Sequence, residues 1–388
     1  MSPPSRPRPA PAEFDVDALL KDPELKVIVT CGSGGVGKTT TAAALGLRAA
    51  EQGRRVVVLT IDPARRLAQS LGLVELDNVP RVVAGIEGEG TLLAMMLDMK
   101  RTFDEVVLAN TTPDKAAQIF ANPFYQSLSA SFAGTQEYMA MEKLSQLRAQ
   151  LIEHGDWDLI VVDTPPSRSA LDFLDAPQRL GRFLDGRMIR LLTAPARAGG
   201  KAYLKVVGAS FSIFSRVLNK ILGNDLLANV SAFVASLETM FGGFRERAEQ
   251  TYRLLKAPGT AFVVVASPEP DALREASFFV ERLQSEQMPL AGVVLNRVRR
   301  TAAQLSGQRA VEAVDRLAEL EQSAAVTLAS TALRVHAETA EAARHDRAMV
   351  ARFAAAHPDV AERQVPALAS DVHDLTGLRA IGNALATG

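Results

Sequence analysis

The sequence predicts an α/β protein in which a mainly parallel sheet is flanked by helices. Its short apolar runs are continuous rather than alternating, which is typical of strands covered on both faces. Helical patterns lie between most of them, as the crossovers of a parallel sheet require. A chain of 388 residues with 47% hydrophobic composition can bury the large core of this fold. The predicted strands are KVIVTC (26–31), RRVVVLTI (54–61), TLLAMMLD (91–98), DLIVVD (158–163), TAFVVVA (260–266) and AGVVLN (291–296).

The first strand is followed by a glycine-rich loop and an alanine-rich stretch over residues 38–53. The stretch closes on Gly53, and glycine commonly ends a helix. Because the second strand follows directly, we expect a β-loop-α-β unit whose helix connects two parallel strands.

Two intervals, 99–157 and 164–258, are too long for simple crossovers and are mostly helical in pattern. We interpret them as one helical subdomain, formed by about 100–156 and 166–257, that is inserted into the sheet domain. Residues 300–357 are again helical and alanine-rich, and residues 364–385 resemble a returning loop and a final helix.

The ends of the chain and its charge limit the classes of protein that fit. Residues 1–24 contain five prolines before residue 12 and predict a disordered tail, while residues 25–388, which lack an internal repeat, predict one domain. The tail has no apolar core segment, so we expect it not to act as a secretory signal. No uncharged apolar stretch reaches the roughly 18 residues of a spanning helix. We expect a cytoplasmic protein, with peripheral attachment to a membrane left open.

Metal-site and nucleic-acid classes are also disfavoured. The formal net charge is −1, without a block of basic residues, so we expect no nucleic-acid partner. Cys31 is the only cysteine, which excludes an intrachain disulfide and a cysteine-based zinc site. The five histidines are scattered in the sequence rather than clustered as zinc ligands are, so we expect no zinc.

A complete phosphate-binding pattern, Gly-x4-Gly-Lys-Thr, runs from Gly32 to Thr39. It follows a predicted strand and opens a predicted helix, the context that separates a P-loop from a glycine-rich turn with a surface lysine. Lys38 is expected to reach the β- and γ-phosphates, and the Thr39 hydroxyl to ligate Mg²⁺. The predicted phosphate-contacting residues are Gly32, Ser33, Gly34, Gly35, Val36, Gly37, Lys38, Thr39 and Thr40. The fold class becomes that of a P-loop NTPase.

Two aspartates follow apolar strands. Asp163 ends DLIVVD and is interpreted as the carboxylate that holds Mg²⁺ through water, the alternative being a helix cap or turn residue. Asp62 follows the second strand and precedes a proline. It is predicted to lie near the metal and to orient the attacking water, with a cap for the helix starting near Ala64 as its alternative. Lys38, Asp62 and Asp163 are therefore the candidate catalytic residues.

These motifs together resemble the deviant-Walker P-loop ATPases that include the arsenical pump-driving ATPase and the tail-anchored-protein targeting ATPase. The pattern is most similar to actinobacterial single-unit members. The resemblance implies Mg²⁺-dependent ATP hydrolysis, with Asn296 recognising adenine and Pro366 lying in a C-terminal nucleotide loop. The matching segments are GSGGVGKTT (32–40), IDPARRLAQSLG (61–72), AGTQE (133–137), DTPPSRSALDFL (163–174), VVLNRV (293–298) and VPAL (365–368).

Three departures from the family pattern matter. Ser33 stands where the family has a signature lysine that reaches the phosphates of the other subunit in a dimer. The expected partner is therefore a related subunit that retains the lysine, and otherwise a second copy of this chain. Arg168 is an alternative source of the cation, and with Ser169 it replaces a family Gly-His pair in switch II. The Cys-x-x-Cys pair that holds zinc in eukaryotic targeting members is missing.

Several functions remain open at this level. Arsenite extrusion depends on several thiolates, which one cysteine cannot supply. Partition- or positioning-type ATPases lack a helical insertion of this size and stay a minor alternative. In residues 203–222, apolar residues recur at steps of three and four and form one helical stripe, here named the 204–221 stripe. The stripe predicts either a surface that binds an apolar helix of a client protein, or a face that packs inside the helical subdomain. The leading role is an ATP-driven switch that handles membrane-protein clients or a membrane-associated partner; its rival is a regulatory or complex-assembly ATPase.

Overall fold

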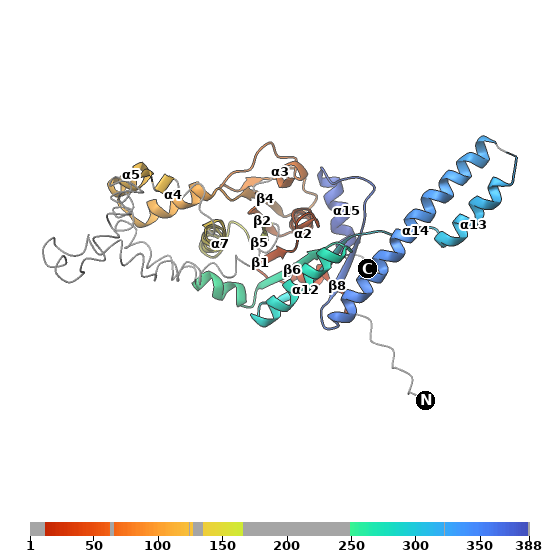
Figure 1. Ribbon diagram of the computed structural model, residues 1–388. Helices are drawn as coiled ribbons and strands as arrows, with labels where there is room; N and C mark the ends of the chain where they lie inside the picture. The colour runs from red at the N-terminus through yellow and green to blue at the C-terminus, as the bar shows by residue number, and fades with distance from the viewer. Residues whose placement is uncertain are drawn as a thin grey trace, which may run out of the picture.

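The computed structural model describes residues 12–62, 66–123, 125–126, 135–165, 249–321 and 323–386. The described residues form an eight-stranded sheet in the order β3-β4-β2-β5-β1-β6-β7-β8, with helices on both faces (Figure 1). Neighbouring strands are parallel except β3 and β4. The strands are β1 (Val27–Cys31), β2 (Arg55–Thr60), β3 (Arg81–Val82), β4 (Thr91–Met96), β5 (Leu159–Asp163), β6 (Thr260–Ala266), β7 (Leu290–Val298) and β8 (Glu362–Pro366). The predicted α/β class is confirmed.

Successive side chains of the central strands enter two different cores. In β1, Val27 and Val29 belong to one buried cluster and Ile28 to the other, as expected when a strand is covered on both faces. The helices that contribute most to the Ile28 cluster are α1 (Val16–Lys21), α2 (Lys38–Glu51), α3 (Arg66–Ser70) and α15 (Leu375–Ala386), and Ala272 near the start of α12 (Pro270–Ser285) also belongs to it. The helices that contribute to the Val27 cluster are α4 (Met99–Asn110), α5 (Pro113–Ala121), α7 (Thr135–Glu153), α12 and α14 (Ala324–Ala356).

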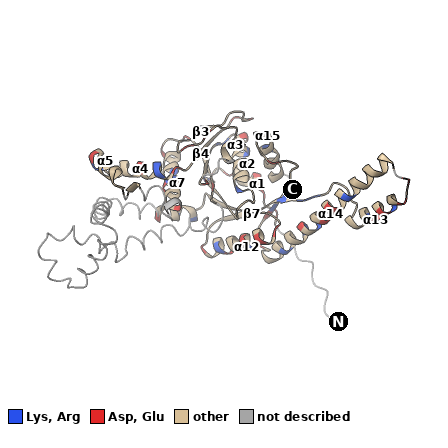
Figure 2. Cartoon of the chain, turned by 45° about the horizontal axis from the view of Figure 1, so that its top comes forward, with Lys and Arg blue, Asp and Glu red and all other residues tan. Residues whose placement is uncertain are grey.

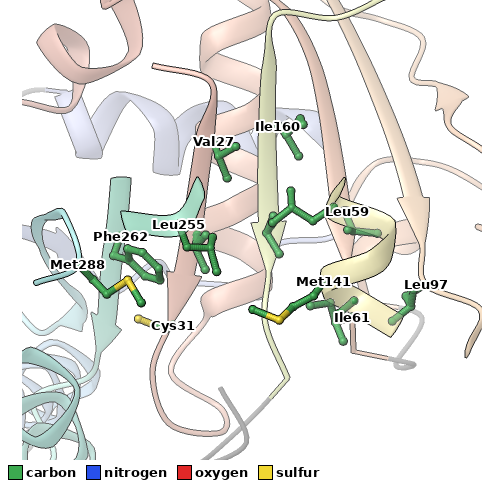
Figure 3. Close-up of a cluster of buried hydrophobic side chains, with 14 of the residues drawn as sticks. Val27, Cys31, Leu59, Ile61, Leu97, Met141, Ile160, Leu255, Phe262 and Met288 are labelled. Carbon is green, nitrogen blue, oxygen red and sulfur yellow. The ribbon is translucent and has the colours of Figure 1, made fainter. Parts of the chain in front are cut away.

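The Val27 cluster extends to the carboxyl ends of the strands, where the predicted phosphate-binding loop begins. Cys31 ends β1 in this cluster, with Phe262 and Met288 on one side and Met141 and Ile61 on the other (Figure 3). The cluster thus anchors both the strand that enters the P-loop and the residue before Asp62.

A helical hairpin lies between β7 and β8 in the chain. Helix α13 (Gly307–Ala318) packs along the first half of α14, and the pair projects away from the sheet (Figure 1). Acidic and basic residues are interspersed along it (Figure 2). An ion pair lies at its base: Asp346 is fully buried and accepts two hydrogen bonds from the guanidinium of the half-exposed Arg299, at 2.6 and 2.9 Å.

The six predicted strands and the final helix are confirmed, and two elements are corrected. Residues 362–366 form edge strand β8 rather than part of a returning loop. Residues 12–24 do not belong to a disordered tail: Asp15 caps α1, and Phe14 is buried and bonds to β8. Both elements depend on long-range pairing that local patterns do not reveal.

The inserted subdomain is described in part. Helices α4, α5 and α7 lie within the predicted 100–156 segment. Most of 166–257, which contains Arg168 and the 204–221 stripe, lies outside the described residues. Among the residues that the structure describes, no helix combines the length and apolarity needed to cross a bilayer.

Candidate nucleotide site

The candidate site residues gather at the carboxyl ends of adjacent parallel strands. The glycine-rich loop 32–37 follows β1, Asp62 follows β2, and Asp163 is the last residue of β5. The strand register pairs Asp163 with Thr30 of β1 on one side and with Thr60 of β2 on the other. Parallel α/β sheets bind ligands at this edge, so the topology joins residues that are far apart in the sequence.

Two glycines of the loop are required by close contacts. Gly32 and Gly37 have φ values of 150° and 95°, which side-chain-bearing residues rarely adopt. A Cβ at Gly32 would lie 2.0 Å from the carbonyl oxygen of Val265, and one at Gly37 would lie 2.2 Å from Nδ2 of Asn296. Residues of the neighbouring strands β6 and β7 therefore lie in contact with the loop, and this leaves no room for side chains at Gly32 and Gly37.

Lys38 begins α2, and its ammonium group folds back onto the loop. Its Nζ donates a hydrogen bond to the backbone oxygen of Ser33 at 2.8 Å, and the residue is 6% exposed. Burial lowers the pKa of Lys38, and the charges of Asp163 and Asp62 act in the opposite direction. A buried cation at the N-terminus of a helix, where the backbone N–H groups also attract anions, suits a phosphate. The Ser33 hydroxyl is buried and has no hydrogen-bond partner among the described residues.

Asp163 accepts two hydroxyl hydrogen bonds on one oxygen. Thr39 Oγ1 donates to its Oδ2 at 2.7 Å and Thr60 Oγ1 at 2.8 Å. The other oxygen, Oδ1, is buried and has no partner in the part of the chain described. Burial raises the pKa of this carboxyl from its ordinary 3.8 to about 6, more than the two hydrogen bonds lower it. An open carboxylate oxygen beside a threonine hydroxyl fits Mg²⁺, which prefers hard oxygen ligands.

The raised pKa predicts how pH changes stability without nucleotide. The folded state holds the Asp163 proton to about pH 6 and the unfolded chain only to about 4, so the contribution of this group to stability is greatest below pH 4 and is lost as pH rises to 6. The two-unit difference corresponds to about 3 kcal/mol. The Asp163→Asn variant should therefore melt above the natural protein at pH 7 and approach it at pH 4, measured by thermal unfolding. A melting difference independent of pH would contradict this titration.

Asp62 lies two residues beyond the end of β2 and is connected to Asp163 through Thr60. The backbone N–H of Asp62 donates to Thr60 Oγ1 at 3.2 Å, and the same hydroxyl donates to Asp163. The negative charge of Asp62 raises the pKa of both Lys38 and Asp163. Its carboxylate is thus electrostatically coupled to both groups expected around the phosphates. Thr60 was not selected from the sequence, although a hydroxyl at the end of an apolar strand is the signal that could have identified it.

Asn296 contacts the loop backbone from β7. Its Nδ2 donates to the carbonyl oxygen of Val36 at 2.8 Å. The next residue, Arg297, reaches the same loop and donates to the carbonyl of Gly35 at 2.9 Å. Arg297 was not predicted, because side chains that follow one another on a regular strand point to opposite faces.

The remaining predicted residues are more dispersed. Pro366 ends β8, where it pairs with Val298 of the adjacent β7. Glu137, within the AGTQE segment, has one buried carboxylate oxygen without a described partner. Cys31 is buried, and burial raises its pKa to about 12. Among the described residues no three His, Cys, Asp or Glu side chains are grouped to hold a metal ion.

Comparisons with known proteins agree with this geometry. The sequence model of a family described as "Anion-transporting ATPase" matches residues 25–321. The chain is 26% identical to ATPase GET3 of Podospora anserina over 289 residues, which are 74% of this chain and 77% of the relative. It is 25% identical to ATPase get3 of Schizosaccharomyces japonicus, covering 74% of this chain and 79% of the relative, and 25% identical to ATPase GET3A of Arabidopsis thaliana, covering 74% and 70%.

Proposed function

Because the chain belongs to the anion-transporting ATPase family and is an ATP hydrolase, we propose that it binds Mg·ATP at loop 32–40 and uses hydrolysis to change conformation. The observation that carries the proposal is the network at the strand ends. Asp163, Thr39 and Thr60 are joined by hydrogen bonds, with Lys38 close enough to lower the pKa of Asp163. The network joins the P-loop to the strand that precedes Asp62.

Each residue has a distinct role in this proposal. The loop N–H groups and Lys38 bind the β- and γ-phosphates, where positive charge stabilises the charge of the transferring phosphoryl group. The Thr39 hydroxyl and, through water, Asp163 and Asp62 hold Mg²⁺, which neutralises charge on the phosphates. The Asp62 carboxylate orients the attacking water. Asn296 and Pro366 lie on the adjacent strands β7 and β8 and are proposed for the adenine side of the site.

Replacing Asp62 with asparagine tests the separation of binding from chemistry. We expect Asp62→Asn to bind Mg·ATP within about threefold of the natural chain while turnover falls about 10²- to 10³-fold, within the range for loss of a general base. Nucleotide titration measures the binding and phosphate release measures the turnover, both in the dimer that hydrolyses ATP. Equal losses of binding in Asp62→Asn and Lys38→Ala would contradict separate roles.

Asp77 supplies the control, since it lies in the loop before β3 and forms a partly exposed ion pair with Arg81. Asp77→Asn should leave binding and turnover unchanged.

The absence of a lysine at Ser33 supports a dimer with a related subunit. In a homodimer of this chain, serine would occupy position 33 in both subunits. Neither nucleotide site would then receive the cation that the family's lysine supplies from the other subunit. We therefore propose a partner that retains the lysine. The composite site would be complete at Lys38, Thr39 and Asp62 of this chain.

The proposed biological role is the handling of membrane-protein clients or of a membrane-associated partner. Its support is family membership together with the 204–221 stripe predicted from the sequence. Arsenite extrusion is not proposed, because the sole cysteine cannot form a site of several thiolates. A regulatory ATPase without an apolar client is the alternative outcome of the following test.

Aspartates in the stripe separate client binding from core packing. We expect Phe211→Asp with Phe214→Asp to abolish capture of a peptide with the sequence of a transmembrane helix, with melting temperature and Mg·ATP binding retained. Ser212→Asp, on the polar side of the same predicted helix, is the control and should retain capture. Unfolding of the double variant would instead assign the stripe to the core, since burying unpaired charge costs several kcal/mol.

A further inference from the structure

The end of strand β7 is irregular at Asn296 and Arg297. The pairing of β7 with β8 shifts register between Leu295 and Val298. Arg297 has φ of 60°, in the left-handed region that side-chain-bearing residues rarely occupy. An irregularity of this type redirects side chains, and such features are frequent beside functional sites. Here it allows two consecutive side chains to reach one loop.

The two side chains bind consecutive carbonyls of the phosphate loop. Arg297 donates to the oxygen of Gly35 and Asn296 to the oxygen of Val36, at 2.9 and 2.8 Å. The irregular turn is itself held, because the Arg297 backbone N–H donates to Asn296 Oδ1 at 2.9 Å. The close approach of Asn296 to Gly37 keeps the contact tight. We name Asn296 and Arg297 together the loop clamp.

Holding these carbonyls also orients two N–H groups. In a planar trans peptide the C=O and the N–H point in opposite directions. With the Gly35 and Val36 oxygens turned toward the loop clamp, the N–H groups of Val36 and Gly37 point to the other side of the loop. Neither of them donates a hydrogen bond to another described residue. They are therefore available to an anion, as in a backbone nest.

We propose that Arg297 is a positioning residue that, together with Asn296, preorganises the phosphate loop by fixing these two peptides. The inference rests on the proposed function, in which this loop binds the phosphates of ATP. Arg297 acts through the backbone rather than on the nucleotide base. It also explains a strained arginine at an exposed position, because regular β geometry would turn its side chain away from the loop.

Binding of Mg·ATP and of magnesium tripolyphosphate, which has no base, tests the proposal. Arg297→Met removes the donor and keeps much of the apolar stem. We expect it to weaken both ligands in the same proportion, about tenfold, with little change in the melting temperature of the nucleotide-free protein. Arg297→Lys, which keeps a donor and the charge, should restore affinity to within about threefold of the natural chain. Arg300→Met makes the same charge change at a nearby exposed position and should bind both ligands normally.

Three results would overturn the proposal. A loss confined to ATP would place Arg297 on the base or sugar, and an equal loss in Arg300→Met would reduce the effect to net charge. Normal binding by Arg297→Met would remove any role for Arg297 while leaving the proposed ATP site intact. Failure of the natural chain to bind either ligand would instead overturn the ATP site, and this inference with it.

Discussion

Replacement of Lys38 by alanine is expected to abolish tight binding of Mg·ATP. The ammonium group is buried at the N-terminus of α2 and is held over the loop by the Ser33 carbonyl. A triphosphate would replace this one neutral acceptor with charged oxygens, which form hydrogen bonds about twice as strong. A charged contact worth about 3 kcal/mol corresponds to a loss of more than about a hundredfold in affinity. Titration with a fluorescent ATP analogue measures it.

The same substitution is not expected to unfold the nucleotide-free protein. Burial already lowers the pKa of Lys38, which means that the charged ammonium is disfavoured when no phosphate is present. Lys26→Ala serves as the control, because Lys26 precedes β1 at the amino ends of the strands, away from the loop, and the described hydrogen bond of its ammonium group is to the Pro23 carbonyl. Retained ATP affinity in Lys38→Ala would contradict the phosphate site, whereas a large fall in melting temperature would show that Lys38 supports the fold.

The sequence is sufficient to predict the central sheet because its strands carry strong local signals. Buried parallel strands such as β1 and β5 need apolar residues on both faces, and this leaves a continuous run that can be read without tertiary information. Edge strand β8 carries no such signal. Its sequence ERQVP is mainly polar, and the buried Arg363 within it is satisfied by the Phe14 carbonyl and Glu13, far away in the sequence.

The candidate site also contains residues that the sequence predicts and residues that it does not. The loop glycines, Lys38 and Thr39 form a contiguous motif whose chemistry requires those residue types, and parallel topology then brings Asp62 and Asp163 to the same edge. The roles of Thr60 and Arg297 could not be predicted in this way. Thr60 depends on a strand register, and Arg297 on an irregularity at the end of β7. Both features arise from tertiary pairing.

Adding a lysine at position 33 is expected to have the second large effect, this time an increase in activity. In the deviant-Walker ATPases described above, a lysine at this position reaches the phosphates held by the other subunit. A cation supplied in trans to a phosphoryl-transfer site can increase the rate about 10³- to 10⁵-fold. In a homodimer of the Ser33→Lys variant each site would receive that cation. We therefore expect the variant to hydrolyse ATP at least about a thousandfold faster than the natural chain alone.

Arg168 provides the competing source of positive charge. It follows Asp163 by five positions in the switch II segment and lies outside the described residues. If it supplied the cation within the same chain, the natural protein would need no lysine from a partner. Arg168→Ala distinguishes the two cases, since it would then remove most of the activity of the purified chain.

We propose that this chain has a complete site for binding Mg·ATP and lacks one cation for turnover. The most direct measurement is the steady-state rate of ATP hydrolysis by the purified chain alone, compared with its Ser33→Lys and Arg168→Ala variants under conditions that saturate nucleotide binding. We predict that the natural chain and Arg168→Ala bind ATP but hydrolyse it close to the background rate, and that Ser33→Lys is active. Full activity of the natural chain, lost in Arg168→Ala, would contradict the claim and indicate a self-sufficient homodimer.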